Sequence, residues 1–149
     1  MENEISEKIE YLNKVAEKNS ANFVKLRDVA KDTAEFLIEK FRKLEIDEVI
    51  VNSRRYYLKK VSATSGFSET FFCVEQELEG ELIESFLDCR SSFFYAGDFN
   101  CKITRSSKSA LFDFARNINN ILDILIEKSK SQIDETTELI DKLAVEHAE

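Results

Sequence analysis

One apolar pattern runs through the first 44 residues of this chain and constrains the fold more than any other feature. Apolar and small residues recur at alternating spacings of four and three, which places them on one side of a long helix. The members of this seam are Ile5, Ile9, Leu12, Ala16, Asn19, Phe23, Leu26, Ala30, Thr33, Leu37 and Leu44. The pattern predicts a helix over about 3–45. Asn19 either fixes the register or partner number of a helix pair, or marks a solvent-facing stretch.

A second helical pattern fills the last 42 residues and predicts a helix over about 107–145, with Ser106 or Ser107 as its N-cap. The chain has no proline and three glycines, so nothing in the sequence interrupts either helix. Because both helices are most apolar near the middle of the chain, we expect an antiparallel pair that brings residues 45 and 107 to one end. The expected helix-pairing seam comprises Ile9, Leu12, Phe23, Leu26, Leu37, Ile118, Leu122, Ile133 and Ile140.

The middle of the chain has the β-branched and aromatic composition of short strands. Strands are expected over 49–51, 55–63 and 67–78, with a further hairpin over 92–104, while 81–88 fits either a short helix or a strand. The sequence therefore predicts an α+β fold with a small antiparallel β-sheet of about four to five strands between two long antiparallel helices. We expect one domain with a helix over 1–45, a β-rich head over 46–106 and a helix over 107–149.

Charge and composition exclude several classes of function. The formal net charge of −8 argues against general nucleic-acid binding. Three cysteines without a CxxC motif and a single histidine, His147, argue against a metal site, and no cofactor motif is present. No apolar run is long enough to span a membrane, and the N-terminus is acidic where a signal peptide is basic, so we expect a cytoplasmic location without membrane contact.

Acidic residues cluster on one predicted strand and just beyond it. The acidic residues are Glu75, Glu77, Glu79, Glu81, Glu84 and Asp88. Because side chains alternate along a strand, the first members of this set would lie on one face. This acidic strip is interpreted either as a docking surface for a basic partner, including a mimic of nucleic-acid phosphates, or as a solvated face that keeps a sheet edge soluble.

A basic and aromatic patch lies on the preceding strand. Interleaved cations and rings can stack bases and hold phosphates, but they also form cross-strand pairs with acids. The patch comprises Arg54, Arg55, Tyr57, Lys59 and Lys60. It supports an alternative hypothesis of nucleic-acid binding.

The order of long helix, β-hairpins and long helix resembles, in outline only, the alpha-type subunit of prefoldin, a coiled-coil holdase. The heads of that family have glycine-rich hairpins, whereas this chain has only Gly66, Gly80 and Gly97. No residue motif transfers, and the resemblance implies only a chaperone as an alternative function.

No catalytic, metal or nucleotide motif rises above chance. We therefore expect a non-enzymatic protein–protein interaction module that forms a homo-oligomer and binds a partner with a basic surface. A special case is a phage or mobile-element inhibitor that blocks a nucleic-acid-binding enzyme through the acidic strip.

Overall fold

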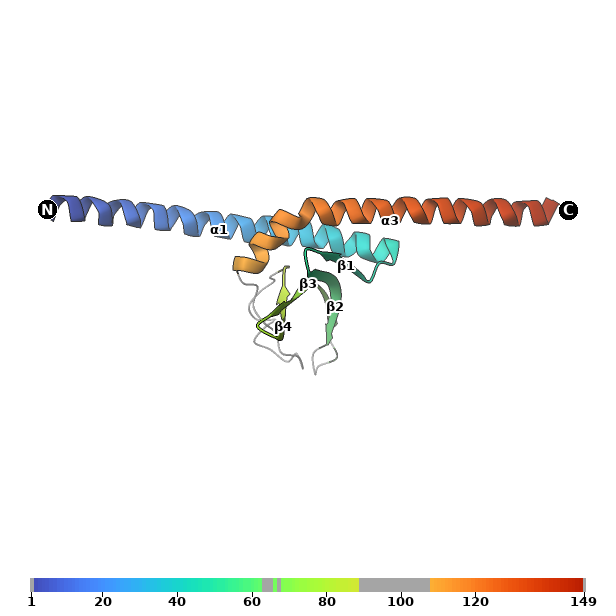
Figure 1. The fold of residues 1–149 in the computed structure, drawn as a ribbon, viewed down its shortest axis with the longest axis horizontal. Helices are drawn as coiled ribbons and strands as arrows, with labels where there is room; N and C mark the ends of the chain where they lie inside the picture. Colours follow the sequence, from blue (N-terminus) through green and yellow to red (C-terminus); the bar gives the residue numbers. More distant parts are fainter. Residues whose placement is uncertain (1, 63–65, 67, 89–107, 149) are drawn as a thin grey trace.

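The computed structural model describes residues 2–62, 66, 68–88 and 108–148 and shows two long helices with a sheet between them in the sequence (Figure 1). The elements are α1 (Glu2–Leu44), β1 (Glu48–Val51), β2 (Arg54–Ser62), β3 (Ser68–Leu78), β4 (Glu81–Phe86) and α3 (Lys108–Ala148). The predicted α+β class is confirmed, and residues 81–86 form a strand. The expected hairpin over 92–104 and the expected N-cap at Ser106 or Ser107 lie outside the described residues.

The four strands form an antiparallel meander in the order β1-β2-β3-β4. Two of its turns have two-residue loops in which both residues have positive φ, as type I′ hairpins require. These are Asn52 (50°) and Ser53 (64°) between β1 and β2, and Glu79 (51°) and Gly80 (82°) between β3 and β4. Such turns match the right-handed twist of the strands, so the local sequence fixes the register of both hairpins.

The C-terminus of α1 is closed by a Schellman motif. The Ile46 amide donates to the Phe41 carbonyl at 2.9 Å, and the Glu45 amide donates to the Arg42 carbonyl at 3.2 Å. Glu45 takes the left-handed φ of 53° that glycine usually supplies. Ile46 is buried directly after the cap, so the motif turns the chain from α1 into β1.

The main core lies between the two helices and one face of the sheet. Phe72 is fully buried and its ring packs on Phe41, Tyr56 and Phe114 at centroid distances of 5.5, 6.1 and 5.6 Å. α1, β2, β3 and α3 each contribute one of these four rings. This cluster fixes both helices on the same face of the sheet.

The two helices run parallel and staggered, which corrects the expected antiparallel pair (Figure 1). The Lys108 ammonium lies 5.0 Å from the ring of Phe23, and Gln132 Nε2 donates to the Leu44 carbonyl at 3.0 Å. α3 therefore begins beside the middle of α1 and reaches the end of α1 only after some 24 residues. The antiparallel expectation was wrong because it assumed that the head returns the chain to the end of α1.

The stagger carries one end of each helix past the end of the other helix, and these ends project in opposite directions from the head (Figure 1). We call residues 2–22 the N-terminal arm and residues 130–148 the C-terminal arm. Each arm is about 30 Å long at a rise of about 1.5 Å per residue. Within the described residues, no helix is both long enough and apolar enough to cross a membrane.

Candidate protein-interaction surfaces

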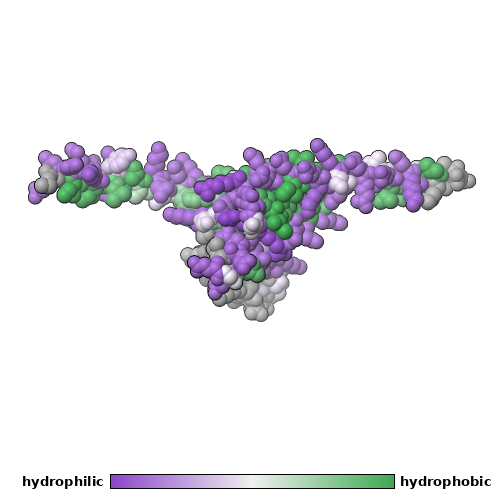
Figure 2. Space-filling model, viewed as in Figure 1, coloured by the Kyte–Doolittle hydropathy of each residue, from purple (hydrophilic) through white to green (hydrophobic). Residues whose placement is uncertain are grey.

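The N-terminal arm exposes the apolar seam that the sequence predicts. Every residue from 2 to 22 is exposed. Ile5, Ile9 and Leu12 have exposed fractions of 58%, 56% and 62%, although the same heptad frame is buried further along α1. Figure 2 shows hydrophobic patches that interrupt the hydrophilic surface of this arm. The arm therefore has the pattern of a helix interface that no described part of its own chain covers.

The C-terminal arm has the same character. Residues 130–145 are all exposed, and Ile133, Ile140 and Leu143 have exposed fractions of 61%, 65% and 55%. Leu139 and Val145 add to this apolar surface at 52% and 62%. Both arms thus combine a helical backbone with a row of large apolar side chains in water.

The structure divides the predicted helix-pairing seam into two groups. Phe23, Leu26, Leu37, Ile118 and Leu122 pack in the main core. Ile9, Leu12, Ile133 and Ile140 lie on the two arms and are exposed. The sequence analysis placed both groups in one seam, because apolar residues recur along both helices although they are densest near the head.

The outer face of the sheet, which is opposite the helices, brings the acidic strip and the basic-aromatic patch together. Arg55 on β2 donates a hydrogen bond to Glu48 on β1, and its Nη1 lies 3.8 Å from Glu75 Oε1 on β3. The guanidinium also lies 4.1 Å from the ring centroid of Tyr57. The hydrogen bond to Glu48 is the main cause that raises the pKa of Arg55.

Glu84 forms the second half of this network. Its carboxylate accepts hydrogen bonds from the Tyr57 hydroxyl and from Lys59 Nζ, the latter at 2.6 Å. Partial burial raises the pKa of Glu84, while the nearby Arg55 charge opposes that shift. Arg55 and Lys59 of the basic-aromatic patch are thus paired with Glu75 and Glu84 of the acidic strip. The strand register brings the two sets together, because β2 pairs with β3 and β3 pairs with β4. Lys60, in contrast, is exposed.

Asp88 is not at the surface. Its side chain is fully buried, and one carboxylate oxygen accepts a hydrogen bond from the Phe72 amide at 2.9 Å. Burial raises the pKa of Asp88 to about 7, with Glu35 adding to the shift and Lys31 opposing it. An external partner therefore cannot reach this carboxyl, although the sequence pattern grouped it with the acidic strip.

The remaining acids of the strip surround the turn between β3 and β4. Glu77, Glu79 and Glu81 are exposed, and Gly80 completes the turn. Leu82, next to them, is 70% exposed. This hairpin end is the part of the predicted strip that a partner can reach.

A polar cluster that the sequence reasoning missed fastens α3 to the β1–β2 turn. Arg54 Nε and Nη2 donate to Asp113 Oδ2 at 2.9 and 2.7 Å. Asn52 Nδ2 donates to Asn117 Oδ1 at 2.7 Å, and Asn117 Nδ2 donates to the Tyr56 hydroxyl at 3.1 Å. Asp113 and Asn117 are four residues apart on the apolar side of the helix, which is the signal that could have revealed the cluster. Arg54, which the sequence analysis placed in the basic-aromatic patch, therefore has a structural role: it ties the β1–β2 turn to α3.

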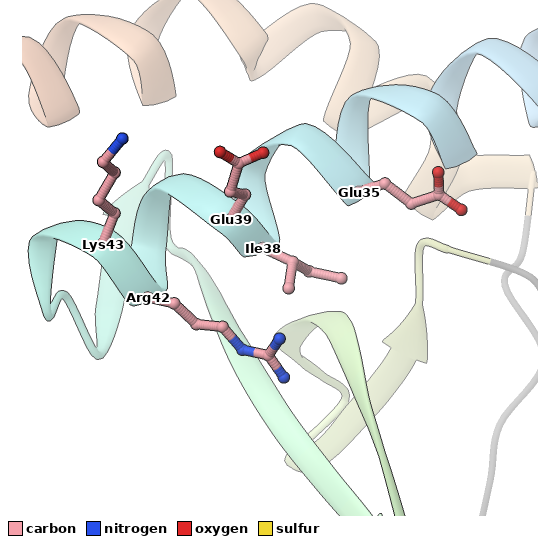
Figure 3. A pocket seen from close by; sticks show the side chains of 5 residues that line it. All are labelled: Glu35, Ile38, Glu39, Arg42 and Lys43. Atoms are coloured by element: carbon pink, nitrogen blue, oxygen red, sulfur yellow. The ribbon is translucent and has the colours of Figure 1, made fainter.

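A surface hollow lies along the C-terminal half of α1 and is lined by Glu35, Ile38, Glu39, Arg42 and Lys43. Figure 3 shows Ile38 and Arg42 pointing toward the sheet and Glu39 and Lys43 pointing away from it. Arg42 Nη2 donates to Thr70 Oγ1 at 2.6 Å. Among the described residues, one helix, α1, supplies the lining of this hollow.

Among the described residues, no group of three or more His, Cys, Asp or Glu side chains is placed to hold a metal ion. Known proteins add no further guide: no protein-family model matches the chain, and neither the curated proteins nor the solved structures contain a match.

Proposed function

We propose that this chain is a non-enzymatic protein-interaction module whose contact surface is the apolar seam of its two helical arms. One observation carries the proposal: large apolar side chains are exposed at helical spacing along both arms, with Leu12 at 62% and Ile140 at 65%. In proteins, most of the stability of a helix comes from the packing of its amphipathic face. A partner that covers the seam would supply that packing.

The exposed apolar residues of each arm form a row and are not isolated from one another. Single exposed apolar residues are normal, whereas contiguous patches usually mark contact sites. On the N-terminal arm the seam extends over Ile5, Ile9 and Leu12 and meets the core at Phe23. The expected partner therefore presents an amphipathic helix.

The test is affinity capture of the tagged chain from nuclease-treated lysates. The double variant Ile9→Gln with Leu12→Gln replaces two apolar seam residues by glutamine, which keeps the helix because glutamine has a high helix propensity. The matched control, Glu7→Gln with Glu10→Gln, changes the same turns away from the seam. The proposal predicts a stoichiometric partner that is lost with the seam variant and retained with the control. Equal capture by both variants would contradict it.

A prefoldin-like holdase is a second candidate, and the exposure of Ile5 and Leu143 near the tips of the arms favours it. A holdase suppresses aggregation of many unfolded proteins at stoichiometric ratio. The measurement is light scattering of a heat-denatured client with wild type and with the seam variant. Undiminished scattering with wild type would reject this candidate.

Inhibition of a nucleic-acid-binding enzyme, as in a phage or mobile-element inhibitor, remains a third candidate because Glu77, Glu79 and Glu81 are exposed together. Replacing these three residues with Gln keeps the Arg55 and Lys59 networks intact and removes the free negative charge. Loss of capture of a partner with a basic groove would support this candidate, and unchanged affinity would reject it.

A further inference from the structure

We propose that the first occupant of the arms is a second copy of this chain: in an isologous dimer, the N-terminal arm of each copy packs antiparallel along the C-terminal arm of the other. This inference rests on the proposed function, because it names the protein that the exposed seams bind. It differs from that function in committing to a partner, a direction and a register.

The parallel stagger of α1 and α3 makes this pairing geometrically closed. The arms project from opposite ends of one rod and have similar lengths (Figure 1). A two-fold axis across the middle of the rod exchanges its ends. Each N-terminal arm then lies beside the C-terminal arm of the other copy, and the two helices run in opposite directions. One symmetry operation covers all four arms, as a closed isologous interface requires.

One register pairs the two seams from Ile9 to Asn19 of the N-terminal arm. With Leu12 opposite Ile140, the heptads place further pairs at each neighbouring layer. The layers are Ile9 with Leu143, Leu12 with Ile140, Ala16 with Thr136 and Asn19 with Ile133. The register spans residues 4–22 on one arm and 130–148 on the other, and among the described side chains residues 4–22 and 130–145 are exposed. Gln132, near the start of the C-terminal arm, also donates to the Leu44 carbonyl of its own chain.

Flanking positions agree with the same register. Val15 and Leu139, which are 39% and 52% exposed, fall beside each other next to the central layers. Ser20 falls beside Lys130, and Asn13 beside Thr137, so no like charges meet at these edges. Shifting one helix by a heptad would place Leu139 beside Lys8 instead of Val15. The matched apolar and polar edges therefore favour the first register.

Continuity with the packing inside one chain supports the same conclusion. The α1 seam already packs in the core from Phe23 to Leu44, and the identical heptad frame continues outward to Ile5. Pairing of two N-terminal arms would leave both C-terminal arms exposed. Parallel head-to-tail pairing would generate an open filament.

Cross-linking of cysteine variants tests the register directly. Ser6 and Ala144 are exposed and fall near each other across the proposed interface, but they lie at opposite ends of one chain (Figure 1). The variants Ser6→Cys and Ala144→Cys are made separately, with Cys89→Ser and Cys101→Ser in both. They are treated with a short bismaleimide alone and as a re-equilibrated mixture. The proposal predicts covalent dimers in the mixture and none with either variant alone.

Cross-linking of Ser6→Cys alone would establish pairing of N-terminal arms and overturn the proposal, as would cross-linking of Ala144→Cys alone or no product in the mixture. A charge exchange gives an independent result. Val15→Lys or Leu139→Glu alone should weaken the dimer roughly tenfold, and the double variant should recover most of the loss because the two new charges pair. Absence of recovery contradicts the register.

Failure of the dimer and failure of the proposed function are distinguishable. A wild-type chain that sediments as a monomer overturns the dimer. If the seam variant Ile9→Gln with Leu12→Gln still loses a lysate partner, the arms bind another protein and the proposed function stands.

Discussion

The middle of the rod and its two arms carry the same heptad pattern in opposite environments. Around Leu37 the seam is fully buried against α3 and the sheet, whereas around Leu12 it is 62% exposed. The difference shows that a heptad predicts an interface but does not say which chain fills it. In the middle the chain fills its own seam, and at the arms the seam is open to another protein.

The largest expected effect is in the middle. Phe72→Ala removes a fully buried ring that packs on three other rings, so it should lower the free energy of unfolding by about 3–5 kcal/mol. Leu12→Ala on the arm should change the unfolding of the isolated monomer far less, because Leu12 loses little burial there. Chemical denaturation at low protein concentration measures both. Comparable losses would mean that the arm packs within its own chain.

Asp88 should make the middle sensitive to pH. Its carboxyl has a pKa of about 7 in the fold and about 4 in the unfolded chain, so the folded protein binds the extra proton between these values. Stability therefore falls as pH rises from about 4 to 7 and levels off above that range. Asp88→Asn, which keeps an oxygen for the Phe72 amide, should raise the melting temperature at pH 8 and leave it almost unchanged at pH 4. An equal effect at both pH values would contradict this account.

Buried and exposed asparagines should behave differently. Asn117→Ala leaves Asn52 and the Tyr56 hydroxyl without their shared partner and should cost about 1–3 kcal/mol. Asn19→Ala on the arm should leave the monomer at least as stable, because alanine favours helix. Thermal unfolding of both variants tests the contrast. A large loss from Asn19→Ala in the monomer would place that residue in a contact within the chain.

Ion pairs on the arms should contribute less to the free energy of unfolding than ion pairs in the middle of the molecule. Lys8 and Glu4 are more than 70% exposed and their charged atoms are 3.6 Å apart, so Lys8→Ala should cost at most about 0.5 kcal/mol. The side chains of Arg54 and Asp113 are 28% and 18% exposed, and two guanidinium nitrogens of Arg54 contact one Asp113 oxygen. Arg54→Ala should therefore lower the free energy of unfolding more than Lys8→Ala does, and this loss should depend less on salt. Denaturation at low and high ionic strength measures both. Equal costs would contradict this difference.

Local chemistry made much of the fold predictable. The helices over 2–44 and 108–148 follow from uninterrupted apolar spacing without proline, and the Asn52 and Ser53 turn follows from residues that tolerate positive φ. The sequence does not decide between helix and strand for residues 81–88, because their pattern fits both periods. Pairing with β3 decides it.

Long-range placement was the part that the sequence could not supply. No local pattern indicates that residue 108 lies beside Phe23. The predicted antiparallel direction of α3 was therefore wrong. Likewise, the acidic strip and the basic patch were weighed as separate surfaces, but the strand register pairs Arg55 with Glu75. The seam on the arms was predictable from the sequence. Its exposure was not, because it depends on how α1 and α3 are staggered.

The most direct test of the central claim is hydrogen–deuterium exchange of the two arms as a function of protein concentration. If the arms are an interaction surface, amides on residues 5–20 and 133–145 should be protected at high protein concentration, where two copies pair, or in the complex with a captured partner. That protection should disappear on dilution or in the variant Ile9→Gln with Leu12→Gln, while β3 stays protected throughout. Arms that exchange at the rate of a free peptide at every concentration, with or without a captured partner, would contradict the account.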